Sequence, residues 1–166
     1  MGSISSIKDG VIDLLETITT PAPGIQNLHR ERPPVTTMAE FLKAFRTVAP
    51  GGGWMVNAWI MEPPRSDMDL TAQAGRVVTT WTIPIIGYMS VSDRKHNKGV
   101  NVSDLMDQIL EQIQIKLLQD TTGFTLGGSV ITVPQVRISQ SPPAFFGETL
   151  TYIGNAEIDA LTRTQF

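Results

Sequence analysis

Residues 54–62, WMVNAWIME, are apolar at nearly every position, and this run constrains the fold more than any other part of the sequence. Alternate residues of an extended chain point to opposite faces, and here both faces are apolar. One face holds Trp54, Val56, Ala58 and Ile60, and the other holds Met55, Trp59 and Met61. A strand of this kind needs cover on both sides, so the run predicts an interior strand.

Three further segments have the character of strands. Residues 76–91, RVVTTWTIPIIGYMSV, are rich in β-branched and aromatic side chains. Pro84 interrupts this segment; because proline has no N–H to donate, it predicts a bulge, a bend or an edge. Residues 129–138 contain a second such proline, Pro134. Residues 148–159 alternate between apolar and polar side chains, which is typical of an antiparallel strand with one wet face.

Three segments have apolar residues at helical spacing. Residues 4–18 carry one apolar stripe, which a segment rich in proline and glycine ends. Residues 102–118 carry the strongest helical pattern, with acids in the N-terminal half, where the helix dipole favours them. A shorter helix is predicted over 38–48, because Thr37 and Glu40 have the spacing of a capping box.

These elements predict a single α+β domain over residues 1–166. The expected architecture is a four-stranded, mainly antiparallel sheet with the two main helices packed on one face, in the order α-(short α)-β-β-α-β-β. Residues 1–3 and 160–166 are expected to be ends that are flexible or that a partner orders. Residues 25–36 are expected to form an exposed loop.

The composition excludes several kinds of chemistry. The chain has no cysteine, so disulfides, thiolate nucleophiles and cysteine metal sites are absent. His29 and His96 are far apart, and we interpret both as exposed loop histidines rather than metal ligands. No G-x-S-x-G motif or phosphate-binding loop is present. We therefore expect no enzymatic activity, with no catalytic, metal or cofactor-binding residue.

Charge and hydropathy also limit the partners. The formal net charge is −3, whereas a general nucleic-acid-binding protein needs a basic face to displace phosphate counterions. No apolar run approaches the length of a membrane-spanning helix, so we expect no membrane partner. Charged residues make up only 17% of the chain, which predicts that partners cover part of its surface.

Two long connections are the candidate interfaces. Residues 63–75 and 139–147 are longer than tight hairpins need, and long ordered loops usually have a function. Adjacent phenylalanines are unusual in a loop, and aromatic residues are enriched at interface hot spots. The candidate interface residues are Arg65, Asp67, Met68, Asp69, Leu70, Phe145 and Phe146. Trp59 and Tyr88 fit the core better than an interface.

The whole pattern resembles a known family. The segments that carry the resemblance are SSIKDGVIDLLETI, WMVNAWIMEP, RVVTTWTIPIIGYMS, VSDLMDQILEQIQIKLL and ETLTYIGNAEIDALTR, in this order. Their order, their lengths and the residue pattern of the strands are similar to those of the tail terminator proteins of long-tailed phages, the minor tail protein U type. The resemblance covers most of the chain and includes no catalytic motif.

The resemblance implies a structural virion protein made in the host cytoplasm. Such a subunit forms a ring, typically a homo-hexamer, at the head-proximal end of the tail tube. The ring caps the tube and joins it to the neck and connector proteins, and DNA passes through its lumen without sequence-specific binding. Two alternatives stay open: another neck, head-completion or baseplate component, and a small-molecule-binding or enzymatic α+β domain.

A ring of this kind needs a lumen that DNA passes without adhering. Asp104, Asp107 and Glu111 lie on one polar face of the predicted helix over 102–118, and a solvated helix face is the simpler interpretation. If the subunit forms a ring, these acids are candidates to face the lumen. The basic residues Arg94, Lys95 and Lys98 occupy a polar turn, and they are candidates for contact with the DNA backbone.

Overall fold

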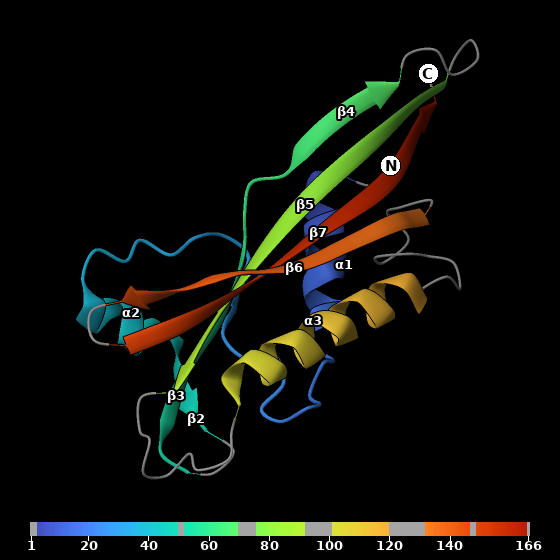
Figure 1. Cartoon of the computed structure of the whole chain (residues 1–166). Helices are drawn as coiled ribbons and strands as arrows, with labels where there is room; N and C mark the ends of the chain where they lie inside the picture. Colours follow the sequence, from blue (N-terminus) through green and yellow to red (C-terminus); the bar gives the residue numbers. More distant parts are fainter. Residues whose placement is uncertain are drawn as a thin grey trace.

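A computed structural model describes residues 3–49, 52–69, 76–91, 101–119, 132–146 and 149–165. The helices are α1 (Ile4–Leu15), α2 (Met38–Phe45) and α3 (Val102–Gln119). The strands are β1 (Leu28–His29), β2 (Arg46–Val48), β3 (Trp54–Met61), β4 (Arg65–Asp69), β5 (Arg76–Val91), β6 (Thr132–Phe146) and β7 (Thr149–Gln165). Figure 1 shows the long, twisted strands β5, β6 and β7 running across the molecule.

The strands form one mixed sheet in the order β1-β3-β5-β7-β6, with β2 also paired to β3 and β4 also paired to β5. Strand β5 is central and pairs antiparallel with β7 from Arg76↔Gln165 to Met89↔Tyr152. The pairs β3–β5 and β6–β7 are antiparallel too, whereas β1 lies parallel to β3. Since β6 pairs only with β7, it forms one edge of the sheet within the described chain.

Pro84 lies in the middle of central strand β5, where a proline is unusual. Its carbonyl accepts a hydrogen bond from the Glu62 N–H at 2.9 Å. In a strand the N–H and C=O of one residue point to the same side, so the missing Pro84 N–H faces the break where β3 ends and β4 begins. Pro84 therefore lies at a local edge of the sheet, and an edge is one of the three placements predicted for it.

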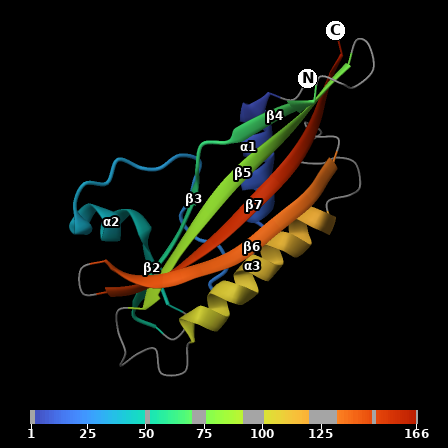
Figure 2. The same ribbon diagram turned by 45° about the horizontal axis from the view of Figure 1, so that its top comes forward.

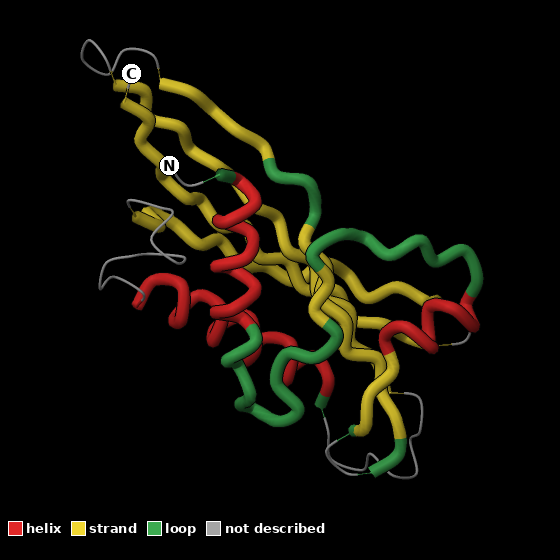
Figure 3. The backbone as a smooth tube through the Cα atoms, turned by 180° about the vertical axis from the view of Figure 1, so that it is seen from behind, coloured by secondary structure: helices red, strands yellow, loops and turns green. Residues whose placement is uncertain are grey.

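The main core lies between one face of the sheet and helices α1 and α3. Seen from behind, α1 crosses in front of the strands (Figure 3). The residues at its centre are fully buried and come from both helices and from strands β3, β5 and β7: Ile7, Val11, Met55, Trp59, Ile83, Ile85, Met106, Ile109 and Ile158. Trp59 lies directly against Gly87 of β5, where a Cβ would come within 2.5 Å of the indole ring. Trp59 is thus a core residue, as expected.

Helix α2 covers the opposite face of β3. Phe45, Val56, Ala58 and Ile60 form a second buried cluster there. In Figure 2 the ribbons of the sheet lie between α2 on the left and α3 at the lower right. The two clusters share β3, so the prediction of an interior strand covered on both sides is confirmed.

The predicted fold class is wrong in its details. The sheet is mixed and has seven strands rather than four, and three helices lie on its two faces rather than two main helices on one. Strands β1 and β2 have only two and three residues, too few for a period of two to be detected. Strand β4, RSDMD, is exposed at every position, so no apolar alternation reveals it.

Three predicted segments also need correction. Residues 65–69 of the expected connection 63–75 form β4. Residues 139–146 of the expected loop 139–147 continue β6, despite Pro142 and Pro143, because the register shifts between Ser141 and Ala144. The expected end at 160–166 is strand as far as Gln165, and Ala160 is buried. Prolines and polar residues predict loops in general, but an edge strand tolerates both.

Candidate interaction surfaces

An aromatic groove lies between α2, the segment before it and the sheet. Phe41 of α2 packs edge-on against Phe45 at 4.7 Å between ring centroids, and it stacks on Phe146 of β6 at 5.7 Å with an interplanar angle of 5°. Tyr88 of β5 meets Phe146 edge-on at 6.0 Å. The groove holds about 310 Å³. Its remaining wall residues are Arg32, Pro33, Val35, Thr36, Thr37, Phe45 and Ile60.

The helix that forms one wall of this groove is fixed by its cap. Thr37 accepts a hydrogen bond from the Glu40 N–H, and the Glu40 carboxylate accepts one from the Thr37 N–H, which completes the predicted capping box. Hydrogen bonds from the backbone and the hydroxyl of Thr36 lower the pKa of Glu40. The side chains of α2 are therefore held in place over the sheet.

Charged and titratable groups lie around the groove. Arg32 forms an ion pair with Glu62 at 2.5 Å, and this hydrogen bond raises the pKa of the guanidinium further. Burial raises the pKa of the Tyr88 hydroxyl. The Arg32 side chain is 64% exposed and the Glu62 side chain 21%, so the cation is the member of the pair that faces solvent.

The prediction that His29 is an exposed loop histidine is wrong. It belongs to β1 rather than to an exposed loop, and its ring packs edge-on against Phe45 at 5.0 Å. Its Nε2 is buried and has no hydrogen-bond partner among the described residues. Burial lowers the pKa of the imidazole, which favours the neutral ring. His96, the second histidine, lies outside the described residues.

A charged array crosses the sheet on the face away from α1 and α3. Arg65 of β4 pairs with Glu157 of β7 at 2.9 Å, and Arg137 of β6 pairs with the same carboxylate at 3.2 Å. Arg137 also pairs with Asp159 at 2.6 Å, and Asp159 accepts a hydrogen bond from the Thr82 hydroxyl at 2.8 Å. Each exposed pair adds little stability, but the set ties β4, β5, β7 and β6 together.

The pKa values in this array follow from its pairs. Burial raises the pKa of Asp159, but the hydrogen bonds from Arg137 and Thr82 lower it more, and the net pKa lies below 3.8. Hydrogen bonds to Asp159 and Glu157 raise the pKa of Arg137. The two cations and the two carboxylates of the array thus compensate one another.

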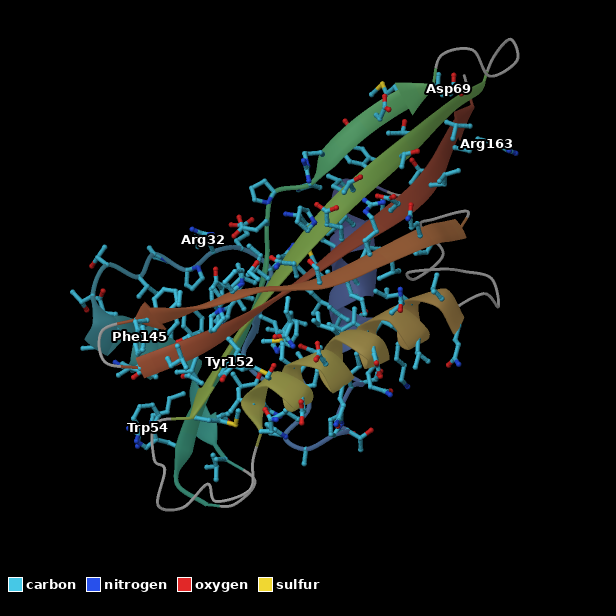
Figure 4. The ribbon with its side chains drawn as sticks, in the orientation of Figure 1. Arg32, Trp54, Asp69, Phe145, Tyr152 and Arg163 are labelled. Carbon is cyan, nitrogen blue, oxygen red and sulfur yellow. The ribbon has the colours of Figure 1, made fainter. Side chains whose placement is uncertain are left out.

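The structure separates the predicted interface residues. Arg65 joins the charged array, whereas Asp67, Met68 and Asp69 lie along β4, with Met68 59% exposed. Phe146 contributes to the groove, but Phe145 beside it is 72% exposed. Figure 4 labels Phe145 at the end of the sheet near α2 and Asp69 at the far end of β4. Leu70 lies outside the described residues.

Of the residues predicted to face a lumen, the structure describes only the three acids, and these lie on α3. Asp104, Asp107 and Glu111 are exposed on α3, and Asp107 accepts a hydrogen bond from the Gln140 side chain at 2.6 Å. Arg94, Lys95 and Lys98 lie outside the described residues. The acids are therefore on the helix side of the sheet, away from the charged array.

Sequence reasoning missed the groove and most of the charged array. The groove joins residues from α2, β3, β5 and β6, and no local spacing brings them together. In the array, alternate residues Gln135, Arg137 and Ser139 are polar, which signals one wet face but not the partners on other strands.

Neither metal-ligand clusters or membrane-spanning helices among the described residues nor known relatives indicate a family for this chain. Within the described parts of the chain, no three histidine, aspartate or glutamate side chains gather as metal ligands, and no helix is long and apolar enough to cross a membrane. No protein-family model matches the chain, and no curated protein matches its sequence.

Proposed function

We propose that this chain is a structural subunit of a phage tail, a tail terminator that assembles into a ring. The resemblance in the order and residue pattern of the five long segments named above supports this function. The observation that carries it is the difference between the two sides of the sheet: α1 and α3 cover one face, whereas α2 and a charged array share the other. A ring built by head-to-tail contacts needs two unlike surfaces on every subunit.

The charge distribution supports the passage of DNA through such a ring. The α3 acids Asp104, Asp107 and Glu111 are exposed, and we assign them to the lumen. An acidic wall repels phosphate, and so DNA slides past it without the counterion release that drives binding. The ring caps the tail tube and meets the neck proteins at its other side.

Mass and shape in solution test this function. Light scattering and native mass spectrometry over a concentration series should give one closed species near six subunits. Negative-stain images should show a ring with a central channel. A monomer or a two-fold dimer at every concentration would contradict the proposal, and a screen for small-molecule ligands of the groove would then follow.

Tail tubes from the phage that encodes the chain separate a terminator from another neck component. A terminator should bind at one end of a purified tube and stop its further growth. Binding to heads but not to tubes would assign the chain to head completion instead. Replacing Asp104, Asp107 and Glu111 by lysine should leave ring formation intact but make the ring retain DNA at low salt.

A further inference from the structure

We infer that Phe145 of one copy inserts into the aromatic groove of the next copy, and that this contact links the subunits head to tail. The inference rests on the proposed assembly into a ring and assigns the residues of its interface. The donor is Phe145 with its neighbour Leu150. The acceptor is the groove formed by Val35, Phe41, Tyr88 and the other wall residues named above.

The donor is an exposed apolar pair. Phe145 and Leu150 face each other across β6 and β7, and they are 72% and 36% exposed. Single exposed apolar residues are common on protein surfaces, but a cross-strand pair that includes a phenylalanine is a candidate anchor. An exposed phenylalanine gains free energy when it is buried, and an assembly contact would supply that burial.

The acceptor is already formed in a single copy. Phe41 and Phe146 are stacked and the capping box holds α2, so the groove needs no rearrangement to receive a side chain. A volume of about 310 Å³ corresponds to roughly ten water molecules, which leaves room for one aromatic ring. Its walls offer edges and faces of Phe41, Phe45 and Tyr88 for aromatic packing.

Donor and acceptor of one copy cannot meet each other. Leu150 has the same orientation as Tyr152, which packs against the main core, so Phe145 points to the side of α1 and α3. Phe146 is the next residue and points to the opposite side, into the groove. The contact must therefore form between copies, and its repetition in one sense produces a ring or a filament.

Charge does not oppose this pairing. The donor side of the sheet carries Asp104, Asp107 and Glu111 of α3, whereas the acceptor side exposes the cations Arg32, Lys43 and Arg46. The acids Glu31, Glu40 and Glu62 lie near these cations, and Glu62 is paired with Arg32. The donor side is thus acidic and the charges of the acceptor side nearly balance, so no like-charge repulsion opposes the contact.

Removing the anchor tests the donor. Phe145→Ala should weaken self-association about tenfold or more, as truncation of a buried interface aromatic usually does. Met68→Ala is the matched control, because it also removes an exposed apolar side chain but lies on β4. Equal assembly of the Phe145→Ala variant and the wild type, at unchanged far-UV circular dichroism, would overturn the inference.

Site-directed cross-linking tests the pairing itself. The chain has no cysteine, so Val35→Cys with Leu150→Cys creates the only two thiols and keeps Phe145. A short bismaleimide should yield a ladder of covalent multimers that ends at the size of the ring. Adding Phe145→Ala should reduce the ladder to the level of the control pair, Val35→Cys with Met68→Cys.

The outcomes separate this inference from the proposed function. If wild-type chains form a ring but the ladder stays at the control level, the interface assignment is wrong and the ring remains. If the cross-link forms mainly within one chain, the placement of donor and acceptor on opposite sides is wrong. If wild-type chains never associate, both the interface and the proposed function fail.

Discussion

At the residue scale, Asn57 shows how one buried polar side chain organises its surroundings. It is fully buried in β3, which is otherwise apolar. Its Nδ2 donates to the Gly24 carbonyl at 2.8 Å, and its Oδ1 accepts from the Trp59 indole at 2.9 Å. These bonds join the segment after α1 to the sheet. They also satisfy polar groups that would otherwise be buried without partners.

Replacing Asn57 by leucine should lower the free energy of unfolding by about 2–4 kcal/mol. The substitution keeps the volume but leaves the Gly24 carbonyl and the Trp59 N–H unpaired, at about 1–3 kcal/mol each. Urea unfolding measures the difference. Ser139→Ala on exposed β6 is the control and should stay within about 0.5 kcal/mol of the wild type. A similar small effect for Asn57→Leu would contradict the structural role of this side chain.

His29 makes stability depend on pH. Burial lowers its pKa in the folded chain below the ordinary value of 6.5, so the unfolded chain binds more protons as the pH falls through 6.5. Stability is therefore complete above pH 6.5 and decreases below it, until the folded chain also takes up the proton. Glu40 and Asp159, whose pKa values are lowered, weaken the fold only in more acidic solution.

The His29→Gln variant should lose this part of the pH dependence. Urea midpoints measured from about pH 5 to 8 should rise with pH for the wild type and stay flatter for the variant. His96→Gln serves as the comparison, because it removes the other histidine. Parallel curves for wild type and His29→Gln would show that burial of this ring does not control stability.

At the element scale, the predicted elements were those with long periodic patterns. Strand β5 has the predicted bounds, 76–91, and α3 differs from its prediction by one residue at its end. Strands β1 and β2 were missed because they are too short to show a period of two, and β4 was missed because it is fully exposed. Strand β4 exists because its backbone pairs with β5 from Arg65↔Thr82 to Asp69↔Val78. Pairing of this kind leaves no mark on local hydropathy.

The cap of α2 should control how firmly that helix stays on the sheet. Thr37→Ala removes the hydrogen bond to the Glu40 N–H and should cost about 1 kcal/mol. Amide exchange in α2 should then be faster by about fivefold. Ser3→Ala removes the matching cap of α1, so it should affect α1 amides instead. Equal acceleration in both helices of the Thr37→Ala variant would indicate global rather than local loosening.

At the scale of the whole molecule, β3 connects two clusters that lie on opposite faces of the sheet. Trp59 belongs to the cluster under α1 and α3, and Ile60 belongs to the cluster under α2. Global loss of packing in one cluster should weaken the other, because both depend on the same strand. Because both clusters share this strand, we expect the single domain predicted from the sequence to unfold as one cooperative unit.

Urea unfolding should therefore show one transition by every probe. Tryptophan fluorescence reports Trp54, Trp59 and Trp81, and far-UV circular dichroism reports the helices and the sheet together. The two curves should coincide in midpoint and slope. An early circular dichroism change that leaves fluorescence unaltered would show that part of the chain unfolds independently.

Local sequence patterns were enough to predict β3, β5, the central parts of β6 and β7, the three helices, the capping box and the need to cover β3 on both sides. These features are local, because side-chain periodicity and backbone capping act within a few residues. Long-range packing, in contrast, makes α2 the second cover and places Phe145 and Phe146 on opposite sides beside a groove. Those outcomes depend on contacts between strands far apart in the chain, which local patterns do not encode.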